Sequence, residues 1–259
     1  MADHLIVLKF GGTALGSPRR IRTAARRLAA WHRRGVRVLA VVSATGHTTD
    51  RIVRRLAAVG ADPHSTPGTE TDRALATGEL LSAALLAAAL ESIGRAAKSL
   101  SGRDAGLSAT GAWGAGVLGS LDPAPVQRLF AGGVIPVVAG FQAGTAAGEL
   151  ITLGRGTSDL SAVFLAARLG ADECHIVTDV QGVCDCDPRH HPAAASFRRL
   201  SPAALVALAE SGAHVVHRGA ARLAANQSIP LRVYRWDASL RGNPGTLIAP
   251  ETPIAAKAS

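Results

Sequence analysis

The first residues that could do chemistry are Lys9-Phe10-Gly11-Gly12-Thr13, near the N-terminus. The lysine ends a predicted strand at residues 5–10 (LIVLKF), and the carboxyl ends of strands in open α/β sheets face the ligand crevice. The two glycines let the backbone approach an anion closely and direct N–H groups toward it. The segment predicts a phosphate-binding turn. Taken alone, it is equally compatible with a strand-ending lysine before an ordinary glycine turn.

A second glycine turn, GRGTSD at residues 154–159, precedes a predicted helix from about 158 to 169. Helix N-termini present unpaired N–H groups and a positive dipole to anions. Arg155 adds a planar fork that suits a carboxylate or a phosphate. Asp159 lies near the same terminus, where it could cap the helix or orient Lys9.

Glu79 and the segment TDVQGV at residues 178–183 are further candidates. Glu79 lies in the middle of a predicted helix among apolar neighbours. A carboxylate is costly to bury there without a cationic partner, so an amino-group ligand is expected. TDVQGV is another strand end that turns on a glycine, and Asp187-Pro188-Arg189 follows it.

Two other patterns are weaker. GAGVLG at residues 114–119 matches the GxGxxG string of dinucleotide sites, but no clear strand precedes it. Leu121-Asp122-Pro123 also interrupts the place where the phosphate-binding helix should begin. Cys184-Asp185-Cys186 is too short and isolated for a zinc site, so no protein metal site is expected.

The elements that must position these residues alternate between buried strands and helices, which predicts an α/β fold with a mostly parallel sheet. Strands are expected at 5–10, 36–43, 134–140, 174–179, 231–234 and 246–249. Helices are expected at 18–33, 49–59, 75–93, about 158–169, 202–211 and 217–226. We expect one αβα domain over 1–250, with an N-lobe of about 1–150, a C-lobe of about 151–250, and a tail at 251–259.

Composition narrows the class of protein. The net charge of +9 comes largely from seven arginines between residues 19 and 34, around an amphipathic helix. With one tyrosine and no stacking platform, a solvated arginine face is favoured over a nucleic-acid site. No uninterrupted apolar run reaches about 18 residues, and the N-terminus lacks the charge pattern of a secretory signal. We therefore expect a cytoplasmic protein that does not bind a membrane.

Several segments, taken in order, resemble the catalytic domain of aspartate kinases within the amino acid kinase family. They are VLKFGGTAL, VVSATGHTTD, LATGELLSAALLAAAL, SGRDAGL, VVAGFQ, ITLGRGTSD, IVTDVQGVCDCDPR and SGAHVVH. The resemblance implies a three-layer αβα sandwich with a mostly parallel sheet of about eight strands. It also implies ATP-dependent phosphorylation of an amino-acid carboxylate, most of all L-aspartate to 4-phospho-L-aspartate, by a homodimer. The same resemblance implies that the N-lobe is the acceptor side and the C-lobe the nucleotide side.

The resemblance also implies roles for single residues. Lys9 would stabilise the transferring phosphoryl group, and Asp159 would organise the lysine. Residues that would hold the amino acid are Ser43, Thr49, Glu79, Arg155 and Ser158. Residues that would bind ATP are Lys9, Gly11, Gly12, Thr13, Thr178, Asp179, Cys184, Arg189 and His214. Mg²⁺ would be carried by the ATP phosphates and would need no protein cage.

Four positions depart from the resembled pattern. A glycine is usual at Thr157, a lysine at His47, a tyrosine at Cys184 and a lysine at His214. The threonine is expected to crowd the acceptor loop. No regulatory ACT domain is expected after residue 250. Two alternatives stay open: a sister kinase for another amino acid or small carboxylate, and a catalytically weakened member that binds nucleotide in a non-enzymatic role.

Overall fold

The protein is described from a computed structural model, which covers residues 4–63, 65, 67–184, 194–212, 215–239 and 244–250. Its centre is an eight-stranded sheet in the order β10-β12-β11-β9-β1-β2-β6-β3. The strands are β1 (Leu5–Phe10), β2 (Arg37–Val42), β3 (Ala97–Leu100), β6 (Ile135–Ala139), β9 (Glu173–Thr178), β10 (Arg199–Leu200), β11 (Leu231–Arg235) and β12 (Thr246–Ile248). The pairs are parallel except for β11 with β12, which confirms the predicted mostly parallel sheet.

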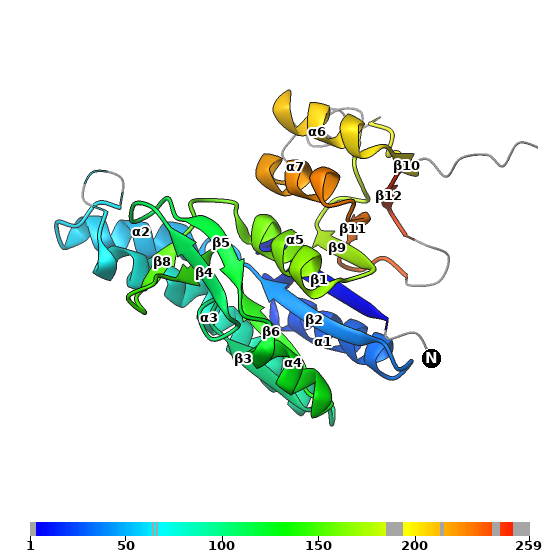
Figure 1. Cartoon of the computed structure of the whole chain (residues 1–259), viewed down its shortest axis with the longest axis horizontal. Helices are drawn as coiled ribbons and strands as arrows, with labels where there is room; N and C mark the ends of the chain where they lie inside the picture. The colour runs from blue at the N-terminus through cyan, green and yellow to red at the C-terminus, as the bar shows by residue number, and fades with distance from the viewer. Residues whose placement is uncertain are drawn as a thin grey trace, which may run out of the picture.

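Helices cover both faces of this sheet (Figure 1). The helices are α1 (Pro18–His32), α2 (Thr48–Ala58), α3 (Thr69–Glu91), α4 (Ala124–Ala131), α5 (Ser158–Leu169), α6 (Pro202–Glu210) and α7 (Arg218–Asn226), with a 3-10 turn, η1 (Thr13–Leu15). Alternate residues of β1 enter opposite layers, because side chains alternate along a strand. Val7 packs in the core that contains α5 and α7, and Leu8 packs in the core that contains α1 and α3.

A second sheet, which the sequence did not predict, has the order β5-β4-β7-β8. Its strands are β4 (Leu107–Thr110), β5 (Val117–Leu121), β7 (Gln142–Gly144) and β8 (Leu150–Thr152). The GxGxxG string at 114–119 lies in the turn and strand that follow β4, and no helix begins there. This local structure is that of a hairpin and not of a dinucleotide-binding turn.

Asp72 joins this second sheet to α3. Its side chain is 1% exposed and accepts three hydrogen bonds. One oxygen accepts from the N–H groups of Thr152 and Gly114 at 2.7 and 3.0 Å, and the other accepts from the Thr152 hydroxyl at 2.9 Å. A buried carboxylate that receives three donors is well compensated for its lost hydration. Asp72 also explains why α3 begins at Thr69, six residues before the predicted start at 75, a stretch that the apolar periodicity did not reveal.

α3 is also the one helix among the described residues that is long and apolar enough to cross a membrane by length and composition. Its most apolar window has a mean hydropathy of 1.5, although charged residues interrupt its apolar runs. Half of that window is buried within the protein. Leu86 and Leu90 are fully buried against the sheet, so α3 packs as a core helix in this fold.

Candidate active site

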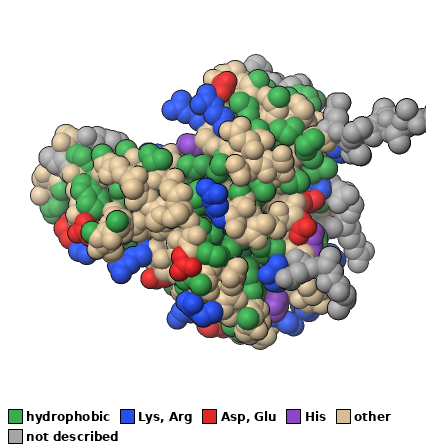
Figure 2. All heavy atoms as spheres, viewed as in Figure 1, with side chains coloured by type: hydrophobic (Ala, Val, Ile, Leu, Met, Phe, Trp, Pro, Cys, Tyr) green, Lys and Arg blue, Asp and Glu red, His purple; other side chains and the backbone are tan. Residues whose placement is uncertain are grey.

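The carboxyl ends of β2, β1 and β9 lie side by side, and they bring residues from distant parts of the chain together. Lys9 on β1 is in register with Val41 on β2 and Ile176 on β9. In the space-filling view, the surface is hollowed between the arm that carries α2 and the lobe that carries α6 and α7 (Figure 2). Strand β1 runs toward this hollow, as expected for the ligand crevice of an open α/β sheet.

Lys9 forms an ion pair with Asp159, the second residue of α5. Its Nζ lies 2.7 Å from Oδ1 of Asp159, and the two side chains are 12% and 9% exposed. The other carboxylate oxygen accepts the backbone N–H of His217 at 3.0 Å. Asp159 thus links the strand-end lysine to the start of α7. The geometry agrees with an orienting role for Asp159, one of the two interpretations of its sequence position.

The glycine turn after Lys9 is held against two neighbouring strand ends. The N–H of Gly11 donates to the Val177 carbonyl at 3.0 Å. A Cβ added at Gly12 would lie 2.5 Å from the carbonyl oxygen of Ala44, closer than any side chain tolerates. Glycine at position 12 is therefore required by the approach of the loop after β2. Thr13 follows as the first residue of η1.

Glu79 lies on the buried side of α3, with 4% of its surface exposed. Its Oε1 accepts the N–H of Ala44 at 2.9 Å, and its Oε2 is buried without a hydrogen-bond partner. Burial raises the pKa of Glu79 to about 7, against the opposing effects of the Ala44 N–H and the positive charge of Lys9. A buried carboxylate oxygen with unused bonding capacity is what a ligand ammonium would need.

Arg155, in the loop before α5, extends to the first turn of α2. Its guanidinium contacts Oδ1 of Asp50 at 2.5 Å, and its side chain is 61% exposed. This contact and a hydrogen bond from His47 hold the pKa of Asp50 below its usual range. Thr49 is beside Asp50 in the sequence, so this bridge joins the loop before α5 to the turn of α2 that carries Thr49.

The other acceptor-side residues lie at element ends. Ser43 follows β2, and its N–H donates to the carbonyl of Phe10 at 3.1 Å. Ser158 is the first residue of α5 and is buried against Gly140, where an added Cβ would lie 2.8 Å from the serine Cβ. Gly140 is a site-supporting residue that sequence reasoning missed.

Two of the departures from the resembled pattern, Thr157 and His47, lie close in sequence to acceptor-side candidates. The Thr157 side chain is 5% exposed, and its hydroxyl donates to the Gly154 carbonyl at 2.6 Å. The hydroxyl therefore closes its own turn, and its φ of −79° does not require glycine. The crowding expected of Thr157 is not seen in these contacts. His47 is exposed at the start of α2, with Nδ1 3.4 Å from a carboxylate oxygen of Asp50.

The nucleotide-side candidates are only partly described. Thr178 ends β9, and its hydroxyl donates to the exposed Asp179 at 3.1 Å, next to the end of β1. Cys184 is buried, with its Sγ 3.8 Å from the Gly182 carbonyl. Arg189 and His214 lie outside the described residues.

His217 is a second residue that sequence reasoning missed. It caps α7: its Nδ1 accepts the N–H of Gly219 at 3.2 Å, while its own N–H donates to Asp159. Burial lowers its pKa. An added Cβ at Gly156 would lie 3.3 Å from the imidazole, so the ring packs on the glycine turn before α5. The string SGAHVVH contained this residue, but the residue contacts are visible only in three dimensions.

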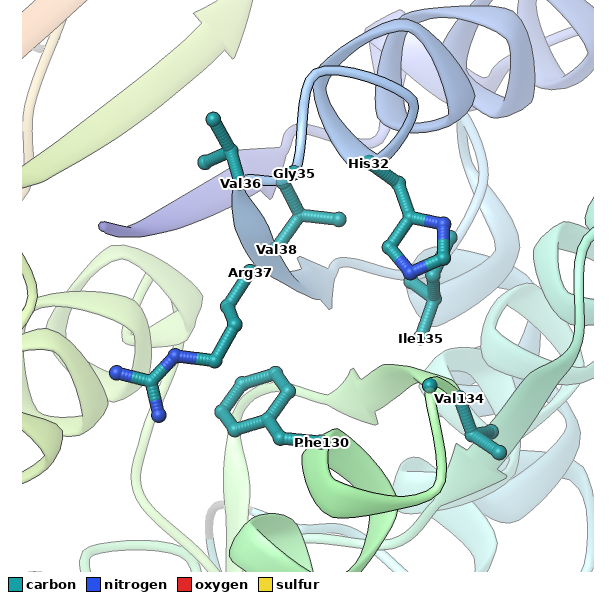
Figure 3. Close-up of a pocket in the computed structure, with 9 residues that line it drawn as sticks. His32, Gly35, Val36, Arg37, Val38, Phe130, Val134 and Ile135 are labelled. Carbon is teal, nitrogen blue, oxygen red and sulfur yellow. The ribbon is translucent and has the colours of Figure 1, made fainter. Parts of the chain in front are cut away.

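A cavity of about 100 Å³ lies elsewhere in the molecule (Figure 3). His32, Arg37, Phe130 and Ile135 line it, with the Arg37 guanidinium 5.3 Å from the centre of the Phe130 ring. It is located at the amino ends of β2 and β6, opposite the end that carries Ser43. The cavity is therefore separate from the cluster around Lys9.

Residues 4–235 match the sequence model of the amino acid kinase family. The chain belongs to the amino acid kinase family. Within it, the chain is 40% identical over 250 residues to an aspartokinase of Geobacillus stearothermophilus, covering 96% of this chain and 60% of that protein. It is 41% identical over 246 residues to the Corynebacterium efficiens aspartokinase, covering 95% and 57%. The chain thus spans about three fifths of the curated relatives that it matches.

Solved structures of this family have the same fold. The aspartate kinase of Synechocystis superposes with a TM-score of 0.82 at 36% identity, covering 95% of this chain and 39% of that one. Aspartokinase III of E. coli, in complex with aspartate and ADP, superposes with a TM-score of 0.80 at 25% identity, covering 96% and 65%. These matches confirm the family and the fold that the sequence segments indicated.

Proposed function

We propose that this member of the amino acid kinase family transfers the γ-phosphoryl group of ATP to the side-chain carboxylate of L-aspartate. The observation that carries the proposal is buried Glu79, which leaves one oxygen unused within the electrostatic influence of Lys9. An amino acid supplies the ammonium for Glu79, and the reacting carboxylate and phosphate supply anions for Lys9. The aspartokinase relatives, and the aspartate and ADP in the complex of a similar structure, support the same acceptor and donor.

In the proposed complex, the protein binds the acceptor through the acceptor's two charged backbone groups. Arg155 binds the α-carboxylate with its planar fork, and Glu79 accepts the ammonium. The hydroxyl groups that complete the acceptor site are those of Ser43, Thr49 and Ser158. Asp50 keeps the Arg155 side chain over α2, so the guanidinium offers its remaining donors to the acceptor.

The chemical step needs positive potential more than it needs a base. The acceptor carboxylate is already ionised at neutral pH, and one of its oxygens forms a bond to the γ-phosphorus. The bond from that phosphorus to the β–γ bridging oxygen breaks, and ADP leaves with its electron pair. Lys9 stabilises the charge on the transferring group, and Asp159 fixes its position.

The nucleotide is proposed to lie at the ends of β1 and β9. The proposed nucleotide-binding residues are Gly11, Gly12, Thr13, Thr178, Asp179, Cys184, Arg189 and His214. Among the described residues, no group of three or more His, Cys, Asp or Glu side chains could hold a metal ion. As the family resemblance implies, Mg²⁺ would be carried by the ATP phosphates, whose charge it would neutralise. We place this reaction in the cytoplasm, where ATP and amino acids are available.

The test measures ADP release with a panel of amino acids, with hydroxylamine present to trap any acyl phosphate. L-aspartate should give both ADP and aspartyl hydroxamate, and Lys9→Met should lower the rates of both by about 10²- to 10³-fold. A hydroxamate from another amino acid alone would identify a sister kinase. No ADP release with any amino acid, while nucleotide still binds, would favour the non-enzymatic alternative.

A further inference from the structure

The loop after β11 lies beside the end of β9, where the nucleotide is proposed to bind. Arg235, the last residue of β11, is in register with Thr178, the last residue of β9. Directly after it, the backbone N–H of Trp236 donates to the carbonyl of Thr178 at 2.9 Å. The half-buried Trp236 side chain packs in the layer that contains α1 and α3. Trp236 is therefore fixed next to a nucleotide-side candidate, and sequence reasoning missed it.

Arg20, in the first turn of α1, connects this loop to the phosphate-binding turn after β1. Its Nη1 donates to the carbonyl of Thr13 at 2.5 Å. The same guanidinium lies 4.8 Å from the centre of the Trp236 ring, a distance typical of a cation–π contact. Thr13 and Thr178 are remote in the sequence, and both are nucleotide-side candidates. Arg20 and Trp236 form a bridge between them.

Two other arginines of α1 hold the same loop. Arg27 is 6% exposed, and its Nη2 donates to the carbonyls of Trp236 and Ala238 at 3.2 and 2.6 Å. The guanidinium of Arg19 lies 5.9 Å from the centre of the Trp236 ring. Three of the seven arginines between residues 19 and 34 are thus engaged with this loop, whereas the sequence favoured a solvated face.

Backbone pairing holds the two nucleotide-side segments together only in part. The N–H of Gly11 donates to the Val177 carbonyl at 3.0 Å and joins the segments where the sheet ends. Thr13 lies beyond this bond, in the three-residue 3-10 turn η1. Short 3-10 turns have poorer hydrogen-bond geometry than an α-helix. The contact from Arg20 to the Thr13 carbonyl therefore adds a constraint after the strand has ended.

We propose that Trp236 and Arg20 are positioning residues of the nucleotide site. Together they fix the phosphate-binding turn relative to the end of β9, and neither side chain needs to touch the nucleotide. The inference rests on the proposed function, because it assumes a nucleotide at the ends of β1 and β9. A merely structural bridge would lower stability alone, whereas a positioning bridge changes nucleotide affinity in a folded protein.

The chemistry of arginine suits both contacts of this bridge. A guanidinium can place its flat face on an aromatic ring while N–H groups at its edge donate to a carbonyl. The ammonium of a lysine is compact and lacks this planar fork. Arg20→Lys should therefore keep the positive charge without restoring the bridge. Trp236→Phe keeps an aromatic face for Arg20 and should retain most of the function.

The first experiment measures ADP binding by calorimetry with Mg²⁺ and without an acceptor, together with KM for ATP and for the acceptor. Arg20→Met and Trp236→Leu should each weaken ADP binding and raise the KM for ATP by about five- to tenfold, the scale of one lost contact. The acceptor KM should stay constant. Arg22→Met is the matched control, because Arg22 is an exposed arginine of the same helix. Circular dichroism should be unchanged in all variants.

The double variant Arg20→Met/Trp236→Leu tests whether the two side chains act as one bridge. Its ADP affinity should be no lower than that of either single variant, because each change alone already breaks the bridge. Additive losses, or single variants that bind ADP like the native chain, would overturn the inference and leave the proposed reaction intact. A native chain that binds no ADP would overturn both.

The second experiment measures hydrogen exchange by mass spectrometry without any ligand. Trp236→Leu should speed exchange in peptides that cover residues 11–15 as well as the loop itself, because the turn loses its link to β9. Peptides from the second sheet, at 107–121, should exchange as in the native chain. Trp236→Phe should show little change. Faster exchange confined to residues 235–239 would overturn the inference, because the turn would then be held without the bridge.

Discussion

The ammonium of Lys9 lies 2.7 Å from the carboxylate of Asp159, and the two side chains are only 12% and 9% exposed. One residue ends the first strand and the other begins α5, so the pair connects the sheet to the helix that covers it. Because Asp159 also accepts the N–H of His217, the lysine is oriented before any ligand binds. Such preorganisation means that little reorganisation is needed when charge develops on the phosphoryl group.

Lys9→Met should lower kcat by about 10²- to 10³-fold, the scale of losing one preorganised electrostatic contact. It should also lower the free energy of unfolding by about 3–5 kcal/mol, because Asp159 is left buried and uncompensated. Lys9→Met/Asp159→Asn separates these effects. The double variant should regain most of the stability in urea unfolding and none of the activity. Recovery of turnover in the double variant would show that the lysine has only a structural role.

Glu79 should make acceptor binding depend on pH. Its pKa near 7 means that the ionised form, which an ammonium needs, increases as the pH rises. The acceptor KM should therefore fall by about tenfold between pH 6 and pH 8, while the KM for ATP changes little. Steady-state kinetics of the native protein and Glu79→Gln provide the measurement. The variant should have a high acceptor KM that does not vary across this range.

The raised pKa of Glu79 also makes the free energy of unfolding depend on pH. Between about pH 4.5 and 7 the folded protein holds a proton that the unfolded chain has released. The free energy of unfolding should therefore decrease as the pH rises through this window, by roughly 3 kcal/mol at most. Denaturant unfolding at several pH values should show a flatter dependence in Glu79→Gln. Equal slopes for the two proteins would contradict the buried state of this carboxyl.

Arg155→Lys should raise the acceptor KM by about tenfold, since the charge is kept but the planar fork is lost. The KM for ATP should barely change. Arg54→Lys is the control, because Arg54 is an exposed arginine of α2 whose Nε donates to the backbone carbonyl of Asp50. An acceptor KM that stays constant in Arg155→Lys would limit Arg155 to its contact with α2.

Thr157→Gly should destabilise the protein without changing acceptor preference. The glycine removes the buried hydrogen bond to the Gly154 carbonyl and adds conformational freedom to the unfolded chain, together worth about 1–2 kcal/mol. Thr157→Ser keeps the hydroxyl and should therefore lose less of the free energy of unfolding. Thermal unfolding and the amino-acid panel are the two measurements. A shift of acceptor preference in the glycine variant would restore the expectation that Thr157 reaches the acceptor.

The sequence revealed the parts of this site that lie on strong local patterns. LIVLKF predicted β1 and the place of Lys9 at its end, and GRGTSD predicted the start of α5 within a residue. The second sheet was missed because its strands have only three to five residues, too few for an alternation of apolar residues to be recognised, as in Gln142–Gly144. Short strands of this kind are stabilised by tertiary contacts, here the hydrogen bonds of Asp72 to Thr152, which local propensity does not encode.

Contacts between residues that are distant in the chain were the other feature that could not be predicted from the sequence. From the sequence, Asp159 could be either a helix cap or a partner of Lys9, and only the packing of α5 against β1 brings the two side chains together. Tertiary packing also explains why three residues that support the site were missed, namely Ala44, Gly140 and His217. Each packs against a residue that is remote in the chain, so no spacing rule within one segment could reveal it.

The central place of β1 has a consequence for how the protein acquires its structure. The strand pairs with β2 on one side and with β9 on the other, and β9 ends at Thr178. During synthesis, the first strand must wait for most of the chain before its second neighbour exists. Parallel pairings over such separations close slowly, because loop entropy is lost before the contacts form. Separate expression of residues 1–150 and 151–250 should therefore yield fragments that aggregate, since either fragment would expose an unpaired central edge.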